Sequence, residues 1–247
     1  MPLLSFANVV KHRWDGSRAL SVLDSVSFTV DDGAFVGLYG ARRSGKSTVL
    51  RLAAGLTLAD AGTVRIDGAD LAAMKAPERA RLLRGTVGLV SDDTWSPRPR
   101  EDVVEYLTLA LGCEGLTAGE ARRRAYAALD EVGVAAVGLE ATSALPVVER
   151  MSVMLARALL FEPRLLLIDE PAVIPSLSGR EQFGALLHTL GERRGLAVLL
   201  ASEELIALQG AAVTMSIGAG ELTSSADDGV VVPFPGRTRA AGQLSAL

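Results

Sequence analysis

A glycine-containing pattern of eight residues near the start of the chain constrains the fold more than any other feature. Residues 40–47 read Gly-Ala-Arg-Arg-Ser-Gly-Lys-Ser and match the pattern G-x-x-x-x-G-K-[ST] in full. The apolar run Phe35–Tyr39 predicts a buried strand before this loop, and Lys46–Leu56 predicts a helix after it. In such a strand–loop–helix unit, successive backbone N–H groups and the positive end of the helix face a bound anion.

The residue types in this loop suit a nucleotide with its metal ion. Glycines allow the backbone to curl, Lys46 places a positive charge between the β- and γ-phosphates, and Ser47 offers a hydroxyl to Mg²⁺. Arg42 and Arg43 either point to solvent or add charge to the phosphate site. The sequence therefore predicts a site for ATP and Mg²⁺ whose nucleotide contacts come from Gly40, Ala41, Arg42, Arg43, Ser44, Gly45, Lys46, Ser47 and Thr48.

Two acids follow a second apolar run, Leu165–Ile168. Ligands bind at the carboxyl ends of the strands in open α/β sheets, and this is where Asp169 and Glu170 stand. We expect Asp169 to hold Mg²⁺, directly or through water, together with Ser47. We expect Glu170 to be the catalytic residue that orients or deprotonates the attacking water.

The remaining pattern predicts an α/β fold with a mainly parallel core sheet. Further apolar runs predict strands, and helical segments lie between several of them. Residues 92–150 carry no strong strand signal, so they are interpreted as a helical subdomain inserted in a core made of residues 1–91 and 151–223. Residues 224–247 contain Pro, Gly and two adjacent acids and are interpreted as a loosely held tail. The other predicted strands are 26–30, 62–68, 87–90 and 197–200, and the other predicted helices are 77–84, 102–111, 118–132 and 153–161.

From Phe6 to Glu221 the chain resembles the ATPase subunits of ABC transporters. The resemblance rests on the phosphate loop, the acidic strand and the stretch Val153–Pro171. It implies a P-loop ABC-type ATPase fold with N-terminal antiparallel strands, among them Asp24–Phe28. It also implies a membrane-embedded permease partner, a second ATPase subunit, and a cytoplasmic, peripheral location on the inner face of the cell membrane. An aromatic residue near the N-terminus of such proteins stacks on adenine, and Trp14 is the best match here, followed by Tyr39.

The chain departs from this family's pattern at positions that serve the γ-phosphate or the opposite subunit. Asp92 stands where the family has a glutamine that contacts Mg²⁺, and it could still reach the metal. Leu145–Glu149 replaces the family's signature motif, and its Pro146 has no N–H to donate. Glu203 replaces a histidine, and its carboxylate would repel phosphate unless it faces away. The loop of residues 172–176 is altered as well.

Three functions follow from these features. The first is a subunit that hydrolyses ATP while docked to a permease, and its second ATPase subunit is expected to be non-identical. The second is a nucleotide-binding but poorly hydrolytic subunit of an asymmetric complex. The third is a soluble P-loop ATPase or kinase outside transport, against which the match at Val153–Pro171 speaks.

Composition narrows the classes of partner and compartment. Lys plus Arg number 25 against 29 Asp plus Glu, a net charge of −4, which argues against a protein that coats nucleic acid. The single Cys113 excludes a disulfide framework and a cysteine-based metal cluster, and a reduced cytoplasmic setting fits it best. The N-terminus is not expected to be a signal peptide, and the uncharged stretch Leu205–Gly220 is too short and polar to span a membrane.

Overall fold

A six-stranded sheet forms the centre of the computed structural model, which describes residues 1–16 and 18–224. Its strand order is β10-β9-β3-β8-β7-β6, and every neighbouring pair is parallel except β10 with β9. The sheet confirms the predicted parallel core. Its strands are β3 (Phe35–Tyr39), β6 (Val87–Val90), β7 (Leu165–Asp169), β8 (Ala197–Ser202), β9 (Val213–Gly218) and β10 (Glu221–Ser224).

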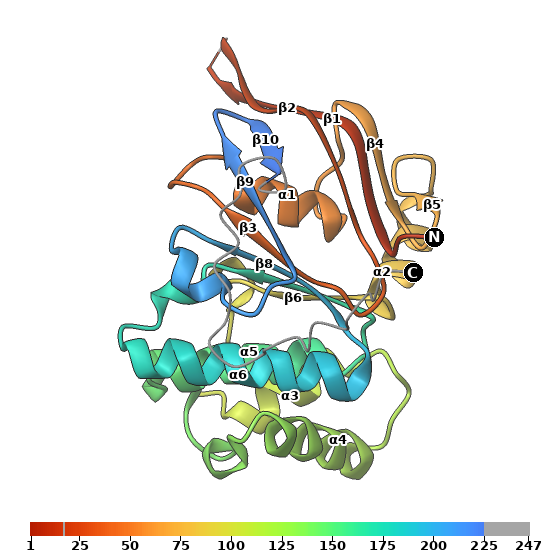
Figure 1. Cartoon of the computed structure of the whole chain (residues 1–247). Helices are drawn as coiled ribbons and strands as arrows, with labels where there is room; N and C mark the ends of the chain where they lie inside the picture. Colours follow the sequence, from red (N-terminus) through yellow and green to blue (C-terminus); the bar gives the residue numbers. More distant parts are fainter. Residues whose placement is uncertain (17, 225–247) are drawn as a thin grey trace, which may run out of the picture.

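A second, antiparallel sheet lies above the first one (Figure 1) and confirms the expected N-terminal antiparallel strands. Its order is β2-β1-β4-β5, and β1 pairs along most of its length with β2 in a long hairpin. Register shifts between Phe6 and Val9 and beyond interrupt the regular pairing and bend this hairpin. The strands are β1 (Leu4–Asp15), β2 (Arg18–Val30), β4 (Ala61–Ile66) and β5 (Ala69–Asp70).

Successive side chains of the core strands lie on opposite faces of the sheet and belong to two separate hydrophobic clusters. In β7, Leu165 and Leu167 join the cluster that contains α1 (Lys46–Ala53) and the antiparallel sheet. Leu166 and Ile168 point the other way, into a cluster with the remaining helices. Figure 1 shows α1 between the two sheets, and α5 and α6 across the opposite face of the core sheet. Strands buried on both faces explain the continuous apolar runs in the sequence.

All five predicted helices are present, and two of them differ from the prediction by three residues or more at one end. Helix α1 ends at Ala53 and not at Leu56, because Gly55 adopts a positive φ of 64° that stops the helix. Helix α5 begins at Val147 and not at Val153, directly after Pro146. Proline suits a helix start, and it outweighs the weak helix preference of the two valines that follow. The helices are α2 (Ala76–Arg84), α3 (Val103–Ala110), α4 (Ala118–Glu131), α5 (Val147–Leu159) and α6 (Leu177–Arg194).

Helix α6 was not predicted, although its ends carry recognisable signals. The Ser176 hydroxyl accepts a hydrogen bond from Gly179 N at 3.1 Å and caps the helix start. Gly195, with a φ of 65°, ends it in the left-handed conformation that closes many helices. Strands β1, β5, β9 and β10 were also not predicted individually. Apart from Ser224, the predicted tail lies outside the described residues.

The division of the chain into a core and a helical subdomain stays a prediction. Helix α5 runs across the proposed boundary at residue 150 and packs against both α4 and β6. Within residues 1–16 and 18–224, no helix combines the length and hydrophobicity that a bilayer span requires.

Gly184→Ala should stabilise the protein by about 0.5–1 kcal/mol, because alanine loses less conformational entropy than glycine inside a helix. Gly184 lies in the middle of α6, and a Cβ there would meet no atom within 4 Å. The measurement is the midpoint of chemical denaturation.

Gly62→Ala is the contrasting variant, because Gly62 has a φ of 78° and its Cβ would lie 2.1 Å from Asn8 O. It should destabilise the chain. Equal effects of the two substitutions would contradict this account.

Candidate functional site

The phosphate loop leaves β3 and enters α1 at the carboxyl edge of the core sheet. Two of its glycines are required by their surroundings. A Cβ on Gly40 would lie 2.5 Å from Ile217 O, and one on Gly45, whose φ is 112°, would lie 2.8 Å from Leu23 Cδ2. Arg43 adopts a φ of 63°, a left-handed conformation that costs a non-glycine residue energy. The loop therefore holds a fixed and partly strained shape.

Lys46 is almost completely buried at the base of this loop. Its Nζ donates hydrogen bonds to Gly40 O at 2.6 Å and Ala41 O at 3.0 Å, and lies 4.0 Å from Glu170 Oε2. The ammonium group is thus satisfied by carbonyls of the loop itself. A phosphate group bound in the loop would gain a charge-assisted contact with it.

Ser47 and Asp169 lie together, as a shared metal site requires. The Ser47 hydroxyl donates a hydrogen bond to the Asp169 carboxylate. Burial raises the pKa of Asp169 above its usual value, and this hydrogen bond and the charge of Lys46 oppose the rise. A hydroxyl and a carboxylate fit Mg²⁺, which prefers oxygen ligands and keeps waters and phosphate oxygens in its shell. No group of three His, Cys, Asp or Glu side chains that could hold a metal occurs among the described residues.

Asp92, the third predicted metal ligand, is engaged elsewhere. Its Oδ1 lies 3.2 Å from Nη2 of Arg150 in α5. The neighbouring Asp93 pairs instead with Arg51 of α1, at 2.8 Å, and its charge raises the pKa of Asp169. Asp93 is therefore the acid after β6 whose charge acts on Asp169, and the sequence analysis did not name it. The role of Asp92 at the metal stays a prediction.

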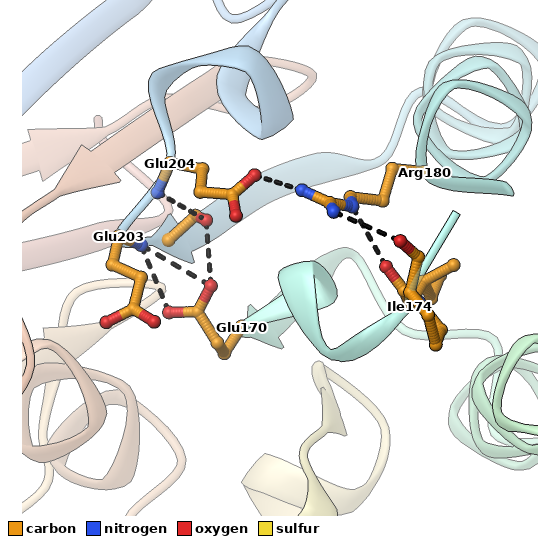
Figure 2. Close-up of polar contacts among 7 residues, drawn as sticks. Glu170, Ile174, Arg180, Glu203 and Glu204 are labelled. Atoms are coloured by element: carbon orange, nitrogen blue, oxygen red, sulfur yellow. Dashed lines mark hydrogen bonds and ion pairs between the residues drawn. The ribbon is translucent and has the colours of Figure 1, made fainter. Parts of the chain in front are cut away.

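Glu170 follows Asp169 in a left-handed conformation with a φ of 49°. Its Oε1 accepts a hydrogen bond from Ser202 Oγ at 2.9 Å, and its Oε2 accepts one from Glu203 N at 3.0 Å (Figure 2). Burial raises the pKa of Glu170, while these two hydrogen bonds and Lys46 lower it; the charge of Glu203 adds to the rise. Glu203 thus acts on the site through both its N–H and its charge. Ser202, which the sequence analysis did not name, is the last residue of β8 and lies two residues beyond the predicted strand.

A cavity of about 660 Å³ opens beside the phosphate loop. The β1–β2 hairpin and the β9–β10 turn form its other walls. The lining includes six basic residues, Lys11, His12, Arg13, Arg43, Lys46 and Arg51, and no carboxylate. Such a lining favours a polyanion such as a triphosphate. A larger cavity, about 840 Å³, lies around Arg84 and Phe161, away from the phosphate loop.

The predicted nucleotide contacts divide between this cavity and its surroundings. Arg43, Ser44, Gly45, Lys46, Ser47 and Thr48 line it, whereas Gly40, Ala41 and Arg42 do not. Trp14 lies on β1 just beyond Arg13, is 70% exposed and does not line the cavity. Its contact with adenine stays a prediction. The hairpin residues Lys11, His12 and Arg13 were not predicted, because their approach to the loop depends on the bend of β1.

The segment that replaces the signature motif forms the start of α5. Pro146 occupies the position before the first helical residue, and Glu149 lies in the first turn. The free N–H groups of Val147 and its neighbours give this end a partial positive charge, and the Glu149 carboxylate offsets that charge. This helix end therefore attracts a phosphate less than an uncharged turn would.

Comparisons with known proteins agree with this geometry. The family model described as "ABC transporter" matches residues 23–173. A Brucella ovis protein, provisionally named a peptide import ATP-binding protein, is 34% identical over 84% of this chain and 66% of its own length. The methionine import ATP-binding protein MetN of Rhizobium etli is 31% identical over 84% of this chain and 56% of its own. The chain thus spans just under two thirds of the first of these relatives.

Solved structures show the same fold. The dimeric structure of MJ0796, a bacterial ABC transporter cassette, superimposes with a TM-score of 0.82. It covers 89% of this chain and 96% of its own, at 24% sequence identity. This likeness confirms the P-loop ABC-type ATPase fold that the sequence predicted.

Glu170→Gln should make the stability of the ligand-free protein less dependent on pH. The pKa of Glu170 is raised from its usual value of 4.5. Between pH 4.5 and the raised pKa, the folded state therefore binds more protons than the unfolded state. Stability contributed by this group is therefore lost as the pH rises from about 4.5 through the raised pKa. The variant should unfold at a higher denaturant concentration than the parent at pH 7.

The gain should disappear at a pH below about 4.5, where the carboxyl group is protonated in both states. This gain in stability is measured by chemical denaturation of the variant and the parent at several pH values in the presence of a chelator. Glu181→Gln, on the exposed face of α6, controls for the loss of one negative charge elsewhere. A gain of the same size at every pH would show that the effect does not come from the carboxyl group's titration.

Proposed function

The chain belongs to the ABC transporter family, and on that premise we propose that it binds Mg-ATP and hydrolyses it as the ATP-binding subunit of a transporter. One observation carries the proposal: a complete phosphate loop, the hydrogen-bonded pair Ser47–Asp169 and the carboxylate of Glu170 meet at one sheet edge. The names of the relatives, which include peptide and methionine import, support uptake of a small solute.

In this mechanism the phosphate loop and Lys46 bind the β- and γ-phosphates of ATP. Lys46 exchanges its contacts with Gly40 O and Ala41 O for phosphate oxygens. Ser47 and Asp169 would hold Mg²⁺, which neutralises charge on the phosphates when bound. Glu170 accepts a proton from the water that attacks the γ-phosphorus, and ADP leaves with the electrons of the broken P–O bond.

The proposed location is the inner face of the cell membrane, with a membrane-embedded permease as partner. The second ATPase subunit is proposed to be non-identical. Pro146 has no N–H at the start of α5, and Glu149 places a negative charge in the first turn. If two copies of this chain faced one another, both γ-phosphates would meet this unfavourable helix end. A partner with a neutral, glycine-rich turn would close the site built on Lys46 and Glu170.

Lys46→Ala should weaken ATP binding by about tenfold or more, because it removes a charge-assisted contact worth roughly 1.5–3 kcal/mol. Equilibrium titration of the purified chain with ATP and Mg²⁺ measures the affinity. Lys75→Ala, at the start of α2, is the matched lysine control and should bind like the parent. Unchanged affinity in a folded Lys46→Ala protein would refute the nucleotide site.

The chain alone should remain a monomer when it binds ATP, because Glu149 and Pro146 disfavour the paired state. The Glu170→Gln variant is the strictest test, since the loss of the base should preserve bound ATP. Its mass in solution is measured by light scattering with and without ATP and Mg²⁺. A tight ATP-dependent homodimer would refute the non-identical partner while leaving the nucleotide site intact.

A further inference from the structure

One arginine joins the two chain segments that flank Glu170. Arg180, in the first turns of α6, donates from Nε to Ile174 O at 2.9 Å and from Nη2 to Pro175 O at 3.3 Å. Its Nη1 forms an ion pair with the Glu204 carboxylate (Figure 2). The guanidinium therefore binds the loop that follows β7 on one side and the turn that follows β8 on the other.

The turn that follows β8 also holds the Glu170 carboxylate. Ser202 is fully buried, and its Oγ accepts a hydrogen bond from Glu204 N at 3.1 Å while it donates to Glu170 Oε1. Glu203 N donates to the second carboxylate oxygen. Each link is therefore direct: Arg180 contacts Glu204, Glu204 contacts Ser202, and Ser202 contacts Glu170.

Glu170 depends on such external support. Its φ of 49° lies in the left-handed region, where a residue with a Cβ is strained. The side chain is also partly buried, with its charge opposed by burial. Without contacts to fix the loop of residues 171–176, the backbone at Glu170 would relax and the carboxylate would lose its direction.

The chemistry of Arg180 suits this role better than that of a lysine. Its donors lie in one plane with fixed spacing, so a single side chain satisfies two carbonyls and a carboxylate at once. Its side chain is only 19% exposed, and the contacts are therefore shielded from water. A lysine in the same place would keep the ion pair but could not bind both carbonyls with the same geometry.

We propose that Arg180 is a positioning residue for Glu170, which it holds in place through Glu204 and Ser202. The expected effect on kcat rests on the proposed hydrolysis of ATP. The expected effect on the structure around Glu170 does not. Arg180 touches neither the phosphate loop nor the cavity beside it, so its loss should act on turnover and leave ATP affinity unchanged.

The test compares Arg180→Ala, Arg180→Lys and the parent in the full chain. For Arg180→Ala we expect kcat to fall by about tenfold or more, with the dissociation constant for ATP changed less than about twofold. Arg180→Lys should lie between the two. Arg193→Ala, at the exposed end of the same helix, controls for the loss of an arginine and should match the parent. An unchanged kcat, or an ATP affinity that falls in parallel with kcat, would overturn the proposal.

A double-mutant cycle with Glu204→Ala tests the route. If Arg180 acts through Glu204, the double variant should be no slower than Arg180→Ala alone. Additive losses would overturn the route through Glu204.

Amide hydrogen exchange gives a second readout that needs no turnover. Arg180→Ala should speed exchange in residues 170–176 and also in residues 202–206, because both segments lose their shared contact. Faster exchange confined to residues 170–176 would overturn the proposal. A parent protein without ATPase activity would refute the hydrolytic function, and exchange would still decide the role of Arg180.

Discussion

The register of the parallel core sheet is the constraint on which the rest of the molecule depends. Tyr39 of β3 pairs with Ser202 of β8, and Asp169 of β7 pairs with Ala201 of the same strand. The residues that follow these strands therefore leave the sheet side by side. This register is what brings the phosphate loop, the acidic pair and the turn after β8 within hydrogen-bonding distance, although long stretches of sequence separate them.

Packing on both faces of this sheet allows the site to hold unfavourable arrangements. Lys46 is buried, and its hydrogen bonds go to backbone carbonyls of the loop; Asp169 and Glu170 have raised pKa values because of burial. Arg43 and Glu170 adopt left-handed conformations. Each of these features costs stability in the ligand-free protein, and each prepares the site for a polyanion, a cation or a water molecule.

Several positions that depart from the family pattern have acquired partners within the chain. Asp92 pairs with Arg150 at the start of α5, and Ser176 caps α6. Glu203 keeps a useful backbone N–H for Glu170 while its charge disfavours the ionised form of that residue. Each of these altered positions therefore has a contact within the chain itself.

The sequence by itself determined the elements whose chemistry is local. The phosphate loop, the strand ending in Asp169 and Glu170, and the double-sided burial of the core strands all follow from neighbouring residue types and short periods. The contacts of Ser202, Asp93 and Arg180 did not follow, because each depends on which strands and helices lie next to one another. The same holds for the start of α5 at Val147 and for the basic hairpin residues beside the cavity. Only the tertiary structure decides such contacts, since sheet order and strand register are set by the packing of the whole core and not by any local pattern.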